Sequence, residues 1–129
     1  MKSRLVLLYT RDRSFDRLLS EALIGTGAIV LIARSVGDAL QVVASRGREL
    51  TFAVLDFNDG RRGMTLLSAI HACHQQLPTL VVTAKESKDA NVVAYANGAR
   101  VCLNKPLPSA RLADAIEDLH PAHSQLAVA

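Results

Sequence analysis

The hydrophobic residues of this chain fall into two kinds of segment, short continuous apolar runs and longer stretches with helical spacing. Short runs of this kind are typical of strands that are buried on both faces of a parallel sheet. We predict a strand at each run, at residues 5–9, 28–33, 51–56, 80–84 and 100–103. The second run, 28–33, is as uniformly apolar as the first, and we expect it to be buried as well.

Apolar residues spaced three and four apart predict a helix after each strand. These helices are expected to begin near Ser14, Ser35, Gly63, Ser87 and Pro108, with the serines as N-caps. The expected buried residues of the third helix are Met64, Leu66, Leu67, Ile70 and Cys73, and the fourth carries Val92, Val93 and Ala96. Strands that alternate with helices require right-handed crossovers, so we predict an α/β fold around a parallel sheet.

Length and composition suit one domain of this class. The chain has 129 residues, half of them hydrophobic, with no Trp, which suits an aliphatic sheet covered by helices. We expect residues 1–120 to form the domain and 121–129 to be a tail or the start of a linker. The first apolar run is too short for a signal peptide or a membrane span, and Cys73 and Cys102 form no CxxC motif. We therefore expect a reduced, cytoplasmic protein without membrane contact.

The charge of the chain argues against nucleic-acid binding by this domain. Its formal net charge is +3, and the basic residues lack interleaved aromatic residues. Arginines are nevertheless frequent near the ends of the first and third strands, at Arg11, Arg13, Arg61 and Arg62. They form either a basic rim that favours an acidic partner or an anionic ligand, or scattered solvated charge interleaved with acidic residues.

A helix in the middle of the chain carries His71, Cys73 and His74, which suggests a zinc site. The remaining histidines, His120 and His123, lie in the expected tail. Zinc requires four ordered ligands, so we favour a solvated helix face with Cys73 inside.

Polar residues follow the predicted strands where each ends, and these ends share one edge of a parallel sheet. They are Thr10, Arg11 and Asp12 after the first strand, Asp56 and Asn58 at the third, Thr83 at the fourth and Lys105 after the fifth. A carboxylate can attack a phosphoryl group while a hydroxyl and an ammonium group hold its oxygens. The pattern is therefore compatible with phosphoryl transfer.

These residues stand in motifs that resemble those of the receiver domain of two-component response regulators. The motifs are Val54-Leu55-Asp56, Val82-Thr83-Ala84, Asn97-Gly98-Ala99 and Leu103-Asn104-Lys105-Pro106, and the resemblance covers roughly residues 4–119. It implies a flavodoxin-like, doubly wound sheet of five parallel strands in the order 2-1-3-4-5 with five helices.

The resemblance also implies roles for individual residues. Asp56 would accept a phosphoryl group from a histidine kinase or phosphotransfer protein, Thr83 would be the switch hydroxyl, and Lys105 would bind the phosphoryl group. The Lys105–Pro106 peptide is often cis in the family. Such a domain is no enzyme beyond autophosphorylation from a phosphodonor and self-dephosphorylation.

The metal site departs from the family pattern. Thr10 and Arg11 stand where the family has an acidic pair, and Asp12 lies one place beyond it. Mg²⁺ prefers carboxylate and other oxygen ligands. We therefore expect Mg²⁺ to bind weakly or not at all, through Asp12, Asp56 and Asn58, or Arg11 to replace the metal by pairing with Asp56.

Two further departures concern the segment after the acceptor and the switch. Residues 58–63 form a connection that is one residue shorter than usual and lacks the common Pro. Val101 or Cys102 occupies the position of the switch aromatic, so the usual coupling of Thr83 to a ring cannot operate in its normal form.

The expected partners follow from the resemblance. They are a kinase or phosphotransfer protein, an output domain of the same chain, and a second copy bound through the last two helices, with Val92, Tyr95, Arg111 and Asp114 as contributors. The alternative is a non-phosphorylated pseudo-receiver that serves dimerisation or protein interaction. A flavodoxin-like nucleotide binder is disfavoured because no Gly-rich loop follows the first strand.

Overall fold

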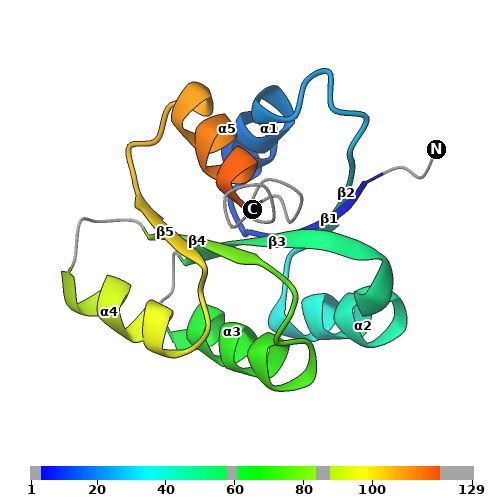
Figure 1. The fold of residues 1–129 in the computed structure, drawn as a ribbon, viewed down its shortest axis with the longest axis vertical. Coiled ribbons are helices and arrows are strands. Elements are labelled where there is room, and N and C mark those ends of the chain that lie inside the picture. Colours follow the sequence, from blue (N-terminus) through cyan, green and yellow to red (C-terminus); the bar gives the residue numbers. More distant parts are fainter. Residues whose placement is uncertain (1–3, 58–60, 84–87, 120–129) are drawn as a thin grey trace, which may run out of the picture.

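The computed structural model describes residues 4–57, 61–83 and 88–119, which form one parallel sheet covered by helices on both faces (Figure 1). The strands are β1 (Leu5–Tyr9), β2 (Ile29–Ala33), β3 (Leu50–Phe57), β4 (Thr79–Thr83) and β5 (Val101–Asn104). Their order in the sheet is β2-β1-β3-β4-β5, which confirms the predicted flavodoxin-like topology.

The helices divide between the two faces of the sheet. They are α1 (Arg13–Ala22), α2 (Val36–Arg46), α3 (Arg61–Cys73), α4 (Lys88–Ala96) and α5 (Ser109–Asp118), with a short 3₁₀ turn, Gly47–Glu49, before β3. Helices α1 and α5 lie on one face, and α2, α3 and α4 lie on the other (Figure 1). Within the described residues, no helix is both long and apolar enough to cross a membrane.

Each face of the sheet has its own hydrophobic core. Alternate residues of one strand contribute to opposite cores, as the pleat of a strand requires. In β1, Leu7 packs on the α2–α3 side, whereas Leu8 packs on the α1–α5 side. Every residue of β1 is buried, as predicted.

The prediction that the second strand is buried is wrong. β2 is one of the two edge strands of the sheet, and Ile29 and Ile32 are 50% and 46% exposed. A continuous apolar run does not distinguish a central strand from an edge strand, because that depends on which strands lie beside it.

Capping agrees with the prediction at one helix and differs at another. The side chain of Ser35 caps α2 by accepting the N–H of Asp38, as predicted. In α1 the N-cap is Asp12 rather than Ser14, because the Asp12 carboxylate accepts the N–H and the hydroxyl of Ser14. The cap predicted at Ser87 lies outside the described residues.

One burial prediction for the helices on the second face is also wrong, because Cys73 is exposed at the end of α3. In α4, Ala94 is buried, whereas Val92 and Val93 are exposed. Gly63 lies within α3 rather than before it. A Cβ at Gly63 would lie 2.3 Å from the ring of Phe57, so only glycine allows the helix to pass so close to β3.

Candidate functional site

The ends of four strands bring the predicted functional residues together at one edge of the sheet. Thr10 follows β1, Asp56 is the penultimate residue of β3, Thr83 ends β4, and Lys105 follows β5. The register pairs Asp56 of β3 with Val82 of β4. It also pairs Thr83 of β4 with residues of both β3 and β5. The side chains of Thr10, Asp56 and Thr83 are buried.

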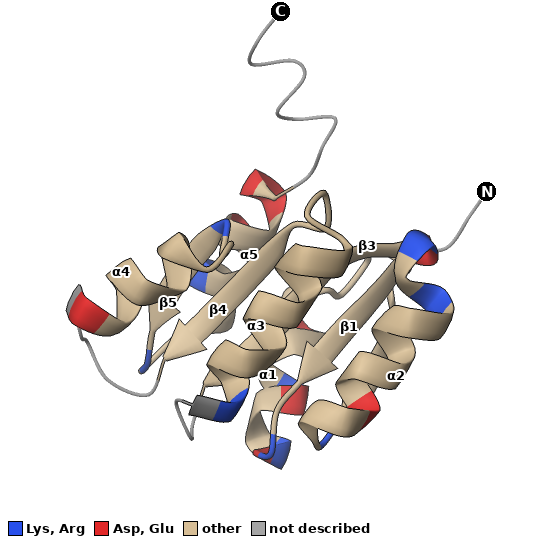
Figure 2. Ribbon diagram, turned by 90° about the horizontal axis from the view of Figure 1, so that it is seen from below, with Lys and Arg blue, Asp and Glu red and all other residues tan. Residues whose placement is uncertain are grey.

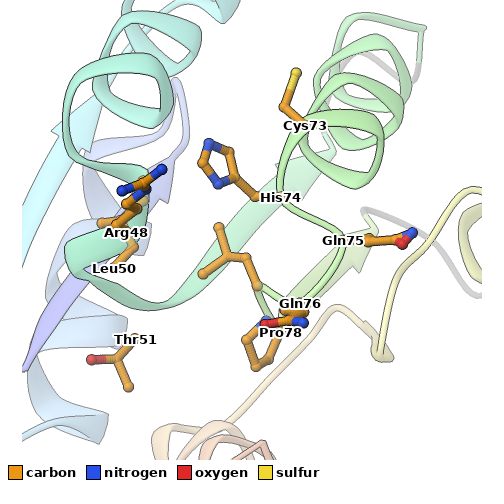
Figure 3. A pocket seen from close by; sticks show the side chains of 10 residues that line it. Arg48, Leu50, Thr51, Cys73, His74, Gln75, Gln76 and Pro78 are labelled. Carbon is orange, nitrogen blue, oxygen red and sulfur yellow. The ribbon is translucent and has the colours of Figure 1, made fainter.

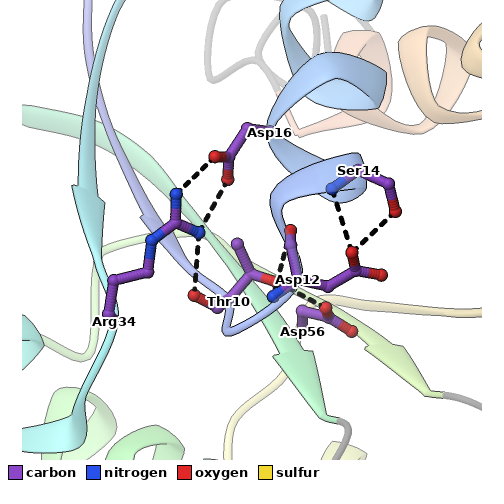
Figure 4. Close-up of polar contacts among 6 residues, drawn as sticks. All are labelled: Thr10, Asp12, Ser14, Asp16, Arg34 and Asp56. Carbon is purple, nitrogen blue, oxygen red and sulfur yellow. Dashed lines mark hydrogen bonds and ion pairs between the residues drawn. The ribbon is translucent and has the colours of Figure 1, made fainter.

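The carboxylate of Asp56 is held at both oxygens. Thr10 donates its hydroxyl to Oδ2 at 2.6 Å (Figure 4), and the Nζ of Lys105 lies 3.0 Å from Oδ1. Asp56 is only 2% exposed, and burial of a charged group is tolerated when it is paired and hydrogen-bonded. The hydrogen bond from Thr10 and the positive charge of Lys105 therefore stabilise the candidate acceptor in its ionised form.

Lys105 is fixed on two further sides. Its Nζ lies 5.3 Å from the centre of the Phe15 ring of α1, a cation–π contact, and its backbone N–H donates to the carbonyl of Thr83. The Lys105–Pro106 peptide is cis, as the resemblance implied. These contacts hold the ammonium group over the end of β3.

Thr83 is linked through side chains to helix α4. The amide of Asn104 donates to the hydroxyl of Thr83, and the amide of Asn91 on α4 donates to Oδ1 of Asn104 at 3.4 Å. Thr83 also lies 3.5 Å from the carbonyl of Leu103. This chain of amides connects β4, β5 and α4, and it is not apparent from sequence motifs.

Asp12 lies near Asp56 but is turned toward α1. Its Oδ1 accepts the N–H and the hydroxyl of Ser14 at 2.9 and 2.7 Å (Figure 4), and these hydrogen bonds lower the pKa of Asp12. Its backbone N–H donates to the hydroxyl of Thr10. In this arrangement Asp12 is a helix cap.

The cation that reaches Asp56 is Lys105, and not Arg11. Arg11 is exposed and forms no ion pair with Asp56 among the described residues. Its side chain instead lines a pocket with Tyr9 and Arg34.

Arg34 is a polar residue at this edge that the sequence analysis missed. It follows β2 and donates to both carboxylate oxygens of Asp16 and to the carbonyl of Thr10 (Figure 4). The hydrogen bonds to Asp16 raise the pKa of Arg34. Its position immediately after a predicted strand is the signal that could have identified it.

Cys102 occupies the β5 position three residues before Lys105, and an aromatic ring reaches it from α4. The hydroxyl of Tyr95 accepts the backbone N–H of Cys102 at 3.1 Å, on β5, the other edge strand of the sheet. Burial raises the pKa of the Cys102 thiol to about 11. A tyrosine therefore contacts β5 at this position, although β5 itself carries no aromatic residue.

One pocket lies at the amino ends of the strands, away from Asp56. It has a volume of about 600 Å³ and is lined by Arg48, Cys73, His74 and residues at the starts of β3 and β4 (Figure 3). The described residues contain no group of three His, Cys, Asp or Glu that could hold a metal ion. His71 and Cys73 are both exposed, so this face of the helix is solvated, and Cys73 does not lie inside as predicted.

Comparison with known sequences assigns the chain to a family. The family profile described as the response regulator receiver domain matches residues 6–117, most of the chain. The chain belongs to the response regulator receiver domain family. It is thus a receiver domain of two-component signalling, and receiver domains of this family typically bind Mg²⁺.

Curated relatives are transcriptional regulators. The chain is 30% identical over 106 residues to the DNA-binding transcriptional regulator NtrC of Escherichia coli K12, and equally to that of Salmonella typhimurium. The match covers 82% of this chain and 22% of each relative, so the receiver domain spans about a fifth of their length.

Solved structures share the fold of this receiver domain. A response regulator receiver domain protein from Clostridium thermocellum superimposes with a TM-score of 0.82 at 20% identity, covering 95% of this chain and 98% of that chain. The receiver domain of NtrX from Brucella abortus superimposes with a TM-score of 0.78 at 24% identity, covering 88% of this chain and 96% of that chain. These likenesses establish the fold alone.

The described residues do not fit the Mg²⁺ site that is typical of the family. Mg²⁺ requires oxygen ligands in near-octahedral geometry, normally including one or two carboxylates. Here Thr10 replaces one carboxylate and donates a hydrogen bond to Asp56, Arg11 adds a positive charge, and Asp12 caps α1. Asn58, the remaining predicted ligand, lies outside the described residues. Asp56 is the carboxylate of the predicted set that contacts both Thr10 and Lys105.

Proposed function

We propose that Asp56 accepts a phosphoryl group from a histidine kinase or phosphotransfer protein, and that Thr83 and Lys105 sense the modified state. The observation that carries this proposal is the contact between Asp56 and Lys105 at 3.0 Å, beside the end of β4. A buried nucleophile with a fixed ammonium group beside it is the minimum that this chemistry needs.

The proposed step uses the two oxygens of Asp56 differently. Oδ2 leaves its hydrogen bond with Thr10 and attacks the phosphorus, while Lys105 continues to neutralise negative charge at the site. The O–P bond forms as the P–N bond to the donor imidazole breaks, and the freed imidazole leaves with the electron pair. The product is an acyl phosphate on β3, next to the hydroxyl of Thr83.

Intact-mass spectrometry with a small phosphodonor tests the proposal. Wild-type protein incubated with phosphoramidate is expected to gain one phosphoryl group that hydroxylamine removes, and Asp56→Asn is expected to gain none. Equal labelling of Asp56→Asn would place the acceptor elsewhere. A folded wild-type protein that stays unmodified at every Mg²⁺ concentration would contradict phosphorylation of Asp56.

A second candidate function is a pseudo-receiver that works through its surfaces. One observation favours it: the Thr10 hydroxyl occupies Oδ2 of Asp56 at 2.6 Å, where an incoming phosphoryl group would have to approach. In this function Asp56 is a structural carboxylate that joins β1 to β5, and partner binding is independent of phosphodonors.

We further propose how the domain is used in a longer regulator. Residues 1–120 would form the receiver domain and 121–129 would begin a connection to an output domain, as the much longer NtrC relatives support. Self-association would use α4, whose Val92 and Tyr95 are 65% and 50% exposed. Large exposed apolar side chains on one helix are typical of a contact surface.

A further inference from the structure

A second pocket opens at the same edge of the sheet as Asp56 but does not include it. Its volume is about 380 Å³, and the residues that matter for its chemistry are Tyr9, Arg11, Arg34, Ser35, Arg62 and Thr65. They come from the ends of β1 and β2 and the starts of α2 and α3. The pocket thus lies close to the boundary between β1 and β3, where the chain connections switch faces and open α/β sheets bind ligands.

The lining of this pocket is basic, although one of its charges, that of Arg34, is already paired with Asp16. Its lining contains three guanidinium groups and, within the described part of the chain, no acidic residue. Arg11 and Arg62 are exposed and form no ion pair with a described carboxylate. Like charges that converge on one pocket repel each other, so an anion between them would be stabilised. Blue ribbon at the start of α3 and in the loop below β1 marks basic residues there, with red ribbon of acidic residues beside the loop (Figure 2).

The third guanidinium is held in place. Arg34 donates to both oxygens of Asp16 and to the carbonyl of Thr10, so its position is fixed relative to α1 and β1 (Figure 4). It supplies a preorganised wall against which the side chains of Arg11 and Arg62 can close. Preorganised groups lose less conformational entropy when a ligand binds.

Neutral donors complete the lining. Ser35 and Thr65 contribute hydroxyl groups, and Ser35 is the N-cap of α2, whose N-terminal N–H groups also favour negative charge. Val36 adds an apolar side chain. Asp38 in the first turn of α2 is exposed and does not line the pocket.

We propose that this pocket binds a small phosphate monoester without a metal ion. Guanidinium groups match phosphate oxygens with paired, charge-assisted hydrogen bonds, which favours phosphate over a simple halide. The volume is at the small end of the range for ligand pockets, enough for a phosphoryl group and a compact organic part. The pocket excludes Asp56, so this proposal does not depend on phosphorylation of that residue.

An amide NMR titration of the full chain with glycerol 3-phosphate tests the proposal, with glycerol and sodium chloride as blanks. Saturable shifts are expected at residues 34–36 and 62–65. Each of the variants Arg11→Gln and Arg62→Gln is expected to weaken binding by about tenfold, since charge-assisted hydrogen bonds are lost. The matched control is Arg100→Gln, which removes an exposed arginine at the opposite edge of the sheet and should bind as wild type does.

Three results would overturn the proposal. Shifts centred on Thr83 and Lys105 would place the anion at Asp56 instead. An equal loss of affinity in Arg100→Gln would mean that binding reflects the net charge of the protein alone. Absence of saturable binding of glycerol 3-phosphate would mean that the pocket is no phosphate site.

Discussion

At the scale of single residues, the site is defined by what replaces the missing carboxylates. Thr10 donates one hydrogen bond to Asp56 and accepts another from the N–H of Asp12, so one hydroxyl connects β1, β3 and α1. Lys105 neutralises the other oxygen of Asp56. A buried carboxylate that lost both contacts would be costly, so Thr10 and Lys105 together stabilise the ionised Asp56.

Restoring the acidic pair should restore metal binding. We expect the double variant Thr10→Asp, Arg11→Asp to bind Mg²⁺ at least about tenfold more tightly than wild type, because it adds two oxygen ligands and removes a repelling charge. An NMR titration with MgCl₂ measures this, with Ca²⁺ as a competitor. The control Arg13→Asp changes charge nearby without providing the acidic pair. Equal affinities in wild type and the double variant would contradict the account of the metal site.

The cap at Asp12 predicts a pH-dependent stability. Hydrogen bonds to Ser14 lower the pKa of Asp12, so its contribution is present above the pKa of the unfolded chain and is lost as pH falls through the lower folded value. We expect Asp12→Ala to lower the free energy of unfolding by about 1 kcal/mol at pH 7, measured by urea unfolding. Asp12→Asn keeps a capping side chain and should lower the free energy of unfolding by less.

The difference in the free energy of unfolding between wild type and Asp12→Asn should shrink below about pH 4, where the carboxylate becomes protonated. A difference that stays constant, or grows, in acid would show that the charge of Asp12 does not stabilise α1.

At the scale of elements, the connection between the site and α4 runs through amides rather than an aromatic side chain on β5. Asn104 joins Thr83 to Asn91, and Tyr95 of α4 accepts the N–H of Cys102. Helix α4 is therefore tied to β5 by hydrogen bonds at Asn91 and Tyr95. These side chains offer one route by which a change at Thr83 can reach α4.

Removing the central amide should disconnect the helix from the site. In Asn104→Ala we expect phosphodonor-induced amide shifts to persist at Asp56 and Thr83 but to fall by at least about half in α4, because the link between them is lost. Tyr95→Phe, which removes only the hydroxyl that contacts Cys102, is the comparison variant. Unchanged α4 shifts in Asn104→Ala would show that another route carries the change.

At the scale of the whole molecule, sequence reasoning reached the topology and the position of the site. Apolar runs fix where strands lie, and a parallel sheet brings their carboxyl ends to one edge, so Asp56, Thr83 and Lys105 could be placed together in advance. The exposure of β2 and the contact between Tyr95 and β5 could not be predicted from the sequence, because both depend on which elements become neighbours. The orientation of Asp12 toward α1 likewise depends on local geometry that spacing does not determine.

The central claim is that Asp56 is a phosphoacceptor whose state reaches α4. It is tested most directly by amide NMR with beryllofluoride, which mimics the phosphoryl group on a carboxylate, with and without Mg²⁺. The account predicts shifts at Thr10, Asp56, Thr83 and Lys105 that continue into α4 and are absent in Asp56→Asn. A wild-type spectrum that does not change at millimolar concentrations would contradict it and would leave the pseudo-receiver as the function of this domain.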